Sequence, residues 1–154
     1  MRFLLVDRIE ELASGRRARG VKNVTLSEDF FTHHFPSTPV MPGALIAESL
    51  VQLASWMIRE ESGFARLGLA ESFDRIKLHR VVHPGDQLAL AVEWLEADAE
   101  RVRFQGEASC RDRRVAEARF TLRLWPAGQF EDAEQARRLF AVMTDPDRLL
   151  GRLG

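Results

Sequence analysis

The sequence predicts an α+β fold in which an antiparallel sheet surrounds one long, buried helix. Three observations support this class: a helix-forming run that begins at Pro42, three alternating segments in the second half of the chain, and a size suited to one core. With 154 residues, 45% of them hydrophobic, the chain can bury one substantial core but is too short for two full domains.

The long helix is predicted directly after Pro42. The run GALIAESLVQLASWMIREE contains no further proline and is rich in residues that favour helices. Proline is well tolerated in the first turn of a helix, where its missing N–H has no helical partner. We therefore expect a helix of about 17 to 19 residues, roughly 25 Å long.

The antiparallel sheet is predicted from the alternation of apolar and polar residues. Three segments alternate clearly, at 88–94, 102–108 and 116–124, and short polar connections at 97–100 and 111–113 suit hairpin loops. Weaker alternation at 16–26 predicts another strand, and apolar spacing at 131–143 predicts an amphipathic helix. We expect residues 1–126 to form one domain and residues 127–154 a helical C-terminal extension packed on it.

Charge and composition exclude several classes of partner. The formal net charge is −1 and the pI is near 6.4, so the chain lacks the basic field typical of a nucleic-acid binder. No apolar run approaches the roughly 20 residues that span a bilayer, and the start, Met1 to Asp7, lacks the pattern of a signal peptide. The single cysteine, Cys110, cannot form an intramolecular disulfide and is expected in a buried strand position. We therefore expect a cytoplasmic protein that contacts neither nucleic acid nor membrane.

Glu48 is the one formally charged residue between Phe35 and Ile58, although 29% of the chain is charged. The helix around it is small or apolar on nearly every side, which is typical of a buried helix. Glu48 and Gln52 lie one turn apart, so a carboxyl group and an amide should point together into a poorly solvated space. Burial without a cation would raise the pKa of the carboxyl group and suit it to acid–base catalysis. The alternative is that Glu48 reaches a surface gap or pairs with an arginine elsewhere.

Two histidines, His33 and His34, stand before a segment in which three prolines fall at every third position. These prolines predict a stiff, extended loop. Either histidine could be a loop residue, a ligand or a base. At the other end of the loop, Gly43 lies where unpaired N–H groups of the helix could bind a developing negative charge, and its missing side chain lets a ligand approach.

Other kinds of site have weaker support. The remaining histidines, His79 and His83, lie in another segment without a recognised ligand spacing, so we expect no metal. Ser49 and Ser55 fall inside the helix and no nucleophile motif surrounds them, which disfavours a hydrolase triad. One group that removes a carbon-bound proton and another that protonates a leaving hydroxyl would instead perform a β-elimination.

The run HFPSTPVMPGALIAESLVQ closely resembles the bacterial 3-hydroxyacyl-acyl-carrier-protein dehydratase family, including the fourteen-residue step from His34 to Glu48. Similar segments extend the resemblance over roughly Phe3 to Leu124. It implies a hot-dog fold, in which the sheet wraps the long helix and two chains form the site between them. His34 of one subunit would face Glu48 of the other in a homodimer or a trimer of dimers.

The resemblance also implies a lyase activity without a cofactor, and a role for each site residue. His34 would take the α-proton, Glu48 would assist departure of the 3-hydroxyl group, and the N–H of Gly43 would hold the thioester carbonyl. The substrate would be an acyl chain linked through phosphopantetheine to acyl-carrier protein, in fatty acid synthesis or in a polyketide or aryl polyene route. The family usually has glycine where His33 and Ser37 stand and proline where Val81 stands. The residues expected to contact the substrate are Gly43, Gln52, His33, Phe35 and Pro42.

Two other functions remain open at this point. The chain could be a non-catalytic hot-dog protein that binds acyl-carrier protein or acyl chains, or it could be a hot-dog thioesterase. In each case where acyl-carrier protein is the partner, basic residues should receive this acidic protein. The candidates are Arg16, Arg17, Arg19 and Lys22, or Arg111, Arg113 and Arg114.

Overall fold

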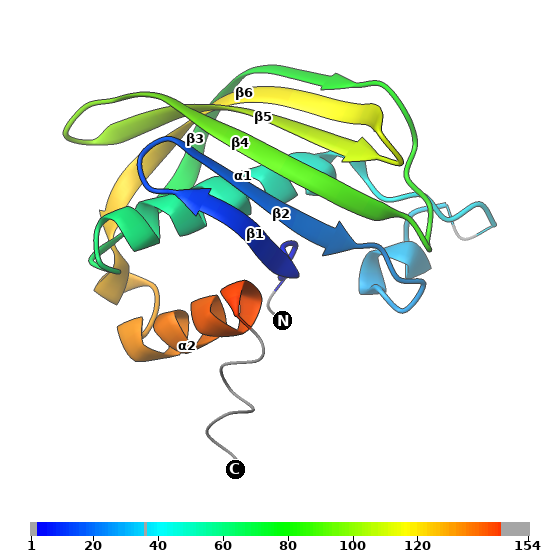
Figure 1. The fold of residues 1–154 in the computed structure, drawn as a ribbon. Coiled ribbons are helices and arrows are strands. Elements are labelled where there is room, and N and C mark those ends of the chain that lie inside the picture. The colour runs from blue at the N-terminus through cyan, green and yellow to red at the C-terminus, as the bar shows by residue number, and fades with distance from the viewer. Residues whose placement is uncertain (1–2, 36, 146–154) are drawn as a thin grey trace, which may run out of the picture.

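A computed structural model describes residues 3–35 and 37–145. It contains one six-stranded sheet in the order β1-β2-β4-β5-β6-β3, in which every neighbouring pair is antiparallel. The sheet curves over α1, and α2 lies beyond α1 on the open side of the sheet (Figure 1). The strands are β1 (Arg8–Ala13), β2 (Arg17–Asn23), β3 (Arg66–Leu78), β4 (Gln87–Ala97), β5 (Arg101–Cys110) and β6 (Arg113–Pro126), and the helices are α1 (Gly43–Glu61), α2 (Ala133–Thr144) and the short 3₁₀-helices η1 (Asp29–Thr32) and η2 (Ala127–Gln129).

The core lies between the inner face of the sheet and α1. Phe104 and Phe120 on neighbouring strands are fully buried, with ring centroids 5.8 Å apart, and Leu50 of α1 is also fully buried. Gly106 in β5 lets the helix approach closely, because a Cβ atom there would lie 3.1 Å from Cδ1 of Leu50. Burial of these apolar side chains holds α1 in a fixed position beneath the sheet. The helix that carries Glu48 is therefore closely packed against the sheet.

Most of the predicted elements are confirmed. The long helix spans 19 residues, Gly43–Glu61, and the three alternating segments form β4, β5 and β6 as consecutive antiparallel strands. Alternation did not reveal β1 or β3. Register shifts interrupt β3 between Ala70 and Ser72 and again between Phe73 and Arg75, so its side chains do not follow a simple two-residue period.

The C-terminal helix was predicted at 131–143 and spans Ala133–Thr144. Asp132 caps its start by accepting a hydrogen bond from the amide of Gln135 at 2.8 Å. Phe140 packs against Trp56 and Phe64, with ring centroids 5.9 and 5.5 Å apart. The last part of the predicted extension, 146–154, lies outside the described residues. Within the described ranges, neither helix is long and apolar enough to cross a membrane.

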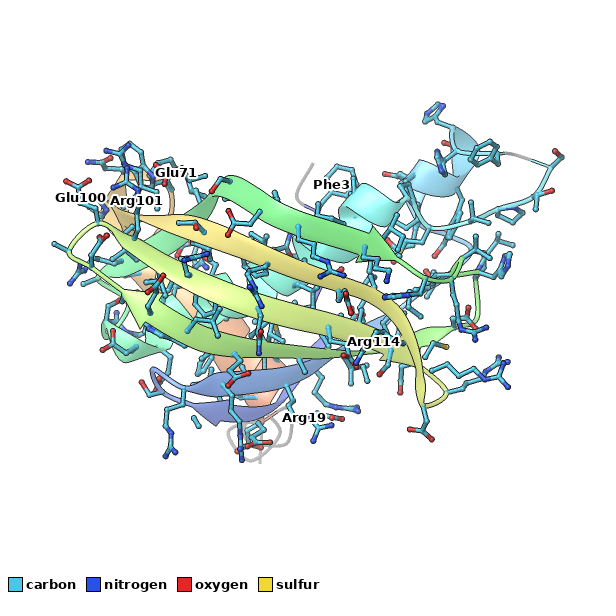
Figure 2. All side chains as sticks on the ribbon, turned by 90° about the horizontal axis from the view of Figure 1, so that it is seen from above. Phe3, Arg19, Glu71, Glu100, Arg101 and Arg114 are labelled. Carbon is cyan, nitrogen blue, oxygen red and sulfur yellow. The ribbon has the colours of Figure 1, made fainter. Side chains whose placement is uncertain are left out.

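Charged side chains cover the outer face of the sheet, where Figure 2 shows Arg19 and Arg114 on strands far apart in the sequence. At one corner, Arg101 donates to Glu71 at 2.6 and 3.1 Å, and this hydrogen bond lowers the pKa of the Glu71 carboxyl group. Burial alone would raise the pKa of Glu117, but Arg75, His79 and Arg114 together hold it below its usual value. These exposed pairs contribute little stability individually and keep this face polar.

Candidate active site

The first turn of α1 presents two unpaired amides. The carbonyl of Pro42 accepts from the amides of Leu45 and Ile46 at 2.9 and 3.2 Å. The amides of Gly43 and Ala44 have no acceptor among the described residues. Free N–H groups at a helix start, aligned with the helix dipole, favour a ligand that carries or develops negative charge.

Gly43 faces the end of β3. A Cβ atom at this position would lie 2.2 Å from Cδ1 of Leu78, so the space beside the glycine is occupied by a flexible apolar side chain. Leu78 itself is half exposed. The predicted approach of a ligand to Gly43 is therefore possible only past Leu78 or after its side chain rotates.

Glu48 lies one and a half turns further along α1 and is half-buried rather than fully buried. Its Oε1 atom accepts a hydrogen bond from Nε2 of Gln52 at 3.1 Å. Among the described residues it forms no ion pair, so the alternative in which an arginine neutralises Glu48 is not observed. The carboxyl group is thus held by one amide and keeps its other oxygen available.

Gln52 also anchors the start of the chain. Its Oε1 atom accepts from the amide of Leu5 at 2.9 Å, and its Nε2 atom donates to the carbonyl of Phe3 at 3.1 Å. The segment before β1 is thereby tied to α1 beside Glu48. Figure 2 shows Phe3 beyond the β3 edge of the sheet. The orientation of Gln52 is fixed by these backbone partners, and it in turn orients Glu48.

A groove of about 300 Å³ opens in front of Glu48. It lies between α1, the start of β3 and the N-terminal segment, and its walls combine apolar and polar side chains. The residues that line it are Phe3, Leu4, Glu48, Val51, Gln52, Ser55, Trp56, Arg59, Gly68, Leu69 and Ala70. A carboxyl group in a groove with both apolar and polar walls suits a substrate with a reactive polar end and a hydrocarbon chain.

His34 lies on the loop between η1 and α1. Its amide donates to the carbonyl of Phe30 at 3.0 Å, and buried Phe31 holds the turn against the core. The imidazole is half-buried and packs edge-on against Phe35, whose φ of 53° places it in the left-handed region. The far end of the loop is fixed where Met41 donates to the carbonyl of Val82 at 2.8 Å. The loop therefore has an anchor on each side of the histidine.

One protomer does not bring all the predicted residues into one cavity. Glu48 and Gln52 line the groove, whereas His33, His34 and Phe35 lie outside the set of residues that line it. Pro42 and Gly43 form the start of α1 between these two groups. Neither imidazole has a hydrogen-bond partner among the described residues. The site is incomplete in one chain if all of these residues act together.

Lys22 was wrongly expected to be available for an acidic partner. The side chain is on the inner face of β2 and only 3% exposed. It forms ion pairs with Glu28 and with Asp7, the latter at 3.6 Å. A cation on an inward-facing strand position has to be paired, and the acidic residues next to it in the fold supply the partners.

Cys110 lies in a strand as expected but is half-buried at the end of β5. Burial, followed by the negative charge of Asp86, raises the pKa of its thiol. Elsewhere in the described chain, no three His, Cys, Asp or Glu side chains are grouped so that they could hold a metal ion.

Several site residues were missed in the sequence. Phe3 and Leu4 line the groove, and Arg59 closes it together with Leu69 of β3. The only available signal was the spacing of Arg59 from Glu48, which places them on the same side of a helix. No sequence pattern indicated that the N-terminal segment would return to Gln52.

Residues 1–119 match the model of a family described as the FabA-like domain. A 3-hydroxyacyl-[acyl-carrier-protein] dehydratase FabZ from Halalkalibacterium halodurans is 45% identical over 75% of this chain and 83% of its own length. The corresponding FabZ from Bacillus subtilis is 45% identical over 79% of this chain and 87% of its own length. A hot-dog-like protein from Thermanaerovibrio acidaminovorans superposes with a TM-score of 0.63 at 17% identity, covering 82% of this chain and 93% of that protein. The expected hot-dog fold is thereby confirmed.

Proposed function

We propose that this chain, which belongs to the FabA-like family, is a hydro-lyase that reversibly dehydrates (3R)-3-hydroxyacyl-acyl-carrier-protein to the trans-2-enoyl thioester. The observation that carries the proposal is the Glu48 carboxyl group, which is held by Gln52 in the wall of a groove that apolar side chains also line. The related FabZ proteins, which are named for this reaction, support it. No chemistry beyond proton transfer is required, so we expect no cofactor.

The reaction is an elimination shared between two side chains. The imidazole of His34 removes the α-proton, and that electron pair forms the double bond as the bond from C3 to oxygen breaks. The carboxyl group of Glu48 donates a proton to the departing oxygen, which leaves as water. The free amide of Gly43 at the start of α1 stabilises the negative charge that develops on the thioester oxygen. Solvent then returns His34 and Glu48 to their starting protonation states.

His34 and Glu48 act across a homodimer in this proposal. The support comes from β3, an edge strand in which every residue except Leu67 and Gly68 is exposed. Leu69, Phe73, Ile76 and Leu78 on this edge are 40–52% exposed although they are large and apolar. A long edge strand that exposes several large apolar side chains to water invites pairing with another strand. Antiparallel pairing of β3 with β3 of a second copy would cover these side chains and close the open side of the groove.

The proposed partner is acyl-carrier protein, whose phosphopantetheine arm would deliver the acyl chain to the groove. Arg111 and Arg113 on the β5–β6 hairpin remain candidates for its docking because both are exposed, and Arg16, Arg17, Arg19 and Arg114 are candidates on the outer face.

We further propose a cytoplasmic location, with residues 1–126 as the catalytic domain and 127–154 as an extension packed on it. The paired edge could also belong to a trimer of dimers.

Substitution of the two catalytic residues tests the proposal. His34→Ala and Glu48→Gln should each lower kcat by about 10²–10⁴-fold, because each removes a proton-transfer group. The measurement is the absorbance of the enoyl thioester formed from a 3-hydroxyacyl-acyl-carrier-protein. His33→Gly, assayed in parallel, tests whether the adjacent histidine contributes to turnover. Undiminished turnover in both catalytic variants would refute the assignment.

The same assay separates the two alternative functions. A thioesterase would release free thiol from the thioester, whereas a dehydratase leaves the thioester bond intact. A non-catalytic acyl-binding protein would bind the substrate at every chain length without forming the enoyl product. We expect enoyl formation without thiol release.

A further inference from the structure

The groove in front of Glu48 follows one side of α1 towards its C-terminal end. Glu48, Gln52, Ser55 and Arg59 are spaced by three or four residues and all line it. From Glu48 to Arg59 this side of the helix extends roughly 16 Å at 1.5 Å per residue. Apolar residues form the opposite wall, including Leu4 and Leu69. A hydrocarbon chain whose reacting end lies at Glu48 would therefore extend towards Arg59.

Arg59 closes the far end of the groove in a fixed position. Its Nε and Nη2 atoms donate to both oxygens of Glu131, at 2.7 and 3.0 Å, and both side chains are only 13% exposed. Its Nη1 atom donates to the hydroxyl of Ser55 at 2.7 Å, and its guanidinium group lies 4.5 Å from the centre of the Trp56 ring. Ser55 is held in turn by the amide and carbonyl of Gly68. A bidentate pair with this many partners has little freedom to move.

A second hollow of about 430 Å³ lies on the other side of Arg59. Arg59 and Leu69 line both hollows, and Phe130, Glu131 and Ala136 come from the segment that follows β6. This segment lies after the residues that match the FabA-like domain, which end at 119. The ion pair of Arg59 and Glu131 therefore forms a partition between the two hollows. The C-terminal extension supplies Glu131.

We propose that the Arg59–Glu131 ion pair sets the upper limit on the length of the acyl chain that this site accepts. The proposal rests on the proposed dehydratase function and adds a specificity determinant to it. A short chain ends beside the apolar side chains of the groove before it reaches Arg59. A longer chain would have to press its methyl end against this charged, hydrogen-bonded pair, and separating the pair would break both of its hydrogen bonds between poorly solvated groups. The site consequently favours short and medium chains over long ones.

Removal of the partition should extend the range of substrates. Arg59→Ala joins the groove to the second hollow and should raise kcat/KM for long chains relative to short ones by about tenfold or more, the scale expected when a few additional methylene groups become buried. Glu131→Gln weakens the pair with almost no change in volume and should shift the preference in the same direction by less. The panel runs from 3-hydroxybutyryl to 3-hydroxypalmitoyl carrier-protein thioesters, with dehydration measured for each.

Two further variants keep the test decisive. Arg138→Ala removes an exposed ion pair with Glu134 on α2, away from both hollows, and should leave the length profile unchanged. The reversed pair, Arg59→Glu with Glu131→Arg, should restore the original limit if the pair acts as a unit. A folded Glu131→Gln variant and a folded Arg59→Ala variant that both retain the original length profile would overturn the inference. If the unmodified protein dehydrates no member of the panel, the proposed function itself fails, which is a distinct outcome.

Discussion

Glu48 is held by a single amide and forms no ion pair with any of the described residues. Gln52 connects this carboxyl group to the backbone of Phe3 and Leu5, so the N-terminal segment and the helix hold each other in place. A carboxyl group held in one orientation is already aligned for proton transfer, whereas a freely rotating one must first adopt that orientation. Gln52 is therefore a positioning residue in the proposed mechanism.

Gln52→Ala should lower both stability and turnover. It leaves the amide of Leu5 and the carbonyl of Phe3 without their partner, at a cost of about 1–3 kcal/mol in the free energy of unfolding. Loss of the bond to Glu48 should reduce kcat while KM changes little. Urea unfolding and steady-state kinetics measure the two effects.

Gln105→Ala is the matched control for this variant. Gln105 donates to Glu93 at 2.6 Å on the outer face of the sheet, and its removal should change stability by less than about 0.5 kcal/mol. If Gln52→Ala loses stability but keeps its full kcat, the positioning role is wrong.

Individual site residues could be predicted from the sequence where their type was unusual for the surrounding residues. Glu48 stood alone in an apolar helix, and a helical spacing placed Gln52 beside it. Contacts between segments far apart in the chain could not be predicted from residue type or spacing. The burial of Lys22 depends on which side of β2 faces the core and on where Asp7 and Glu28 come to lie.

At the scale of elements, α1 carries Glu48, Gln52 and Arg59, and the segment just before α2 supplies Glu131, the proposed limit of the groove. The helix could be predicted because its composition and its starting proline agreed. Strand β3 could not, because two register shifts removed the alternation by which strands are recognised. The missed strand is the one that forms a groove wall and the exposed edge of the sheet.

The helix cap at the start of α2 should contribute to the stability of the C-terminal extension. Asp132→Ala removes the side-chain cap on the amide of Gln135 and should lower the free energy of unfolding by about 1 kcal/mol. Glu134→Ala in the same turn disrupts only an exposed pair and should cost less than about 0.5 kcal/mol. Equal effects of the two variants, measured by urea denaturation, would show that the cap does not stabilise α2.

At the scale of the whole molecule, a single chain leaves β3 unpaired at one edge of the sheet, and its expected site residues do not all line one groove. In the proposed homodimer, the second copy of the chain would cover the apolar residues of β3, close the open groove and bring in the loop of His34. An edge strand cannot be identified from the sequence alone, because the order of strands in a sheet depends on long-range pairing. The resemblance to a dimeric family provided that expectation.

Ile76→Lys tests the proposed edge. Ile76 is 45% exposed on β3, and a lysine there should disfavour strand pairing between two copies. The variant should sediment as a monomer and lose most of its dehydratase activity. Leu95→Lys, at an equally exposed position of β4, should remain dimeric and active. A monomeric Ile76→Lys variant with full activity would contradict a shared site.

The most direct test of the shared site is complementation between two inactive variants. His34→Ala and Glu48→Gln are purified separately, mixed, and allowed to exchange subunits while dehydration of a 3-hydroxyacyl-acyl-carrier-protein is followed. If His34 of one subunit works with Glu48 of the other, each mixed dimer contains one intact site and activity should return. If mixed dimers form, as judged by tagged subunits, but turnover stays at the level of the separate variants, the two residues do not act across the interface.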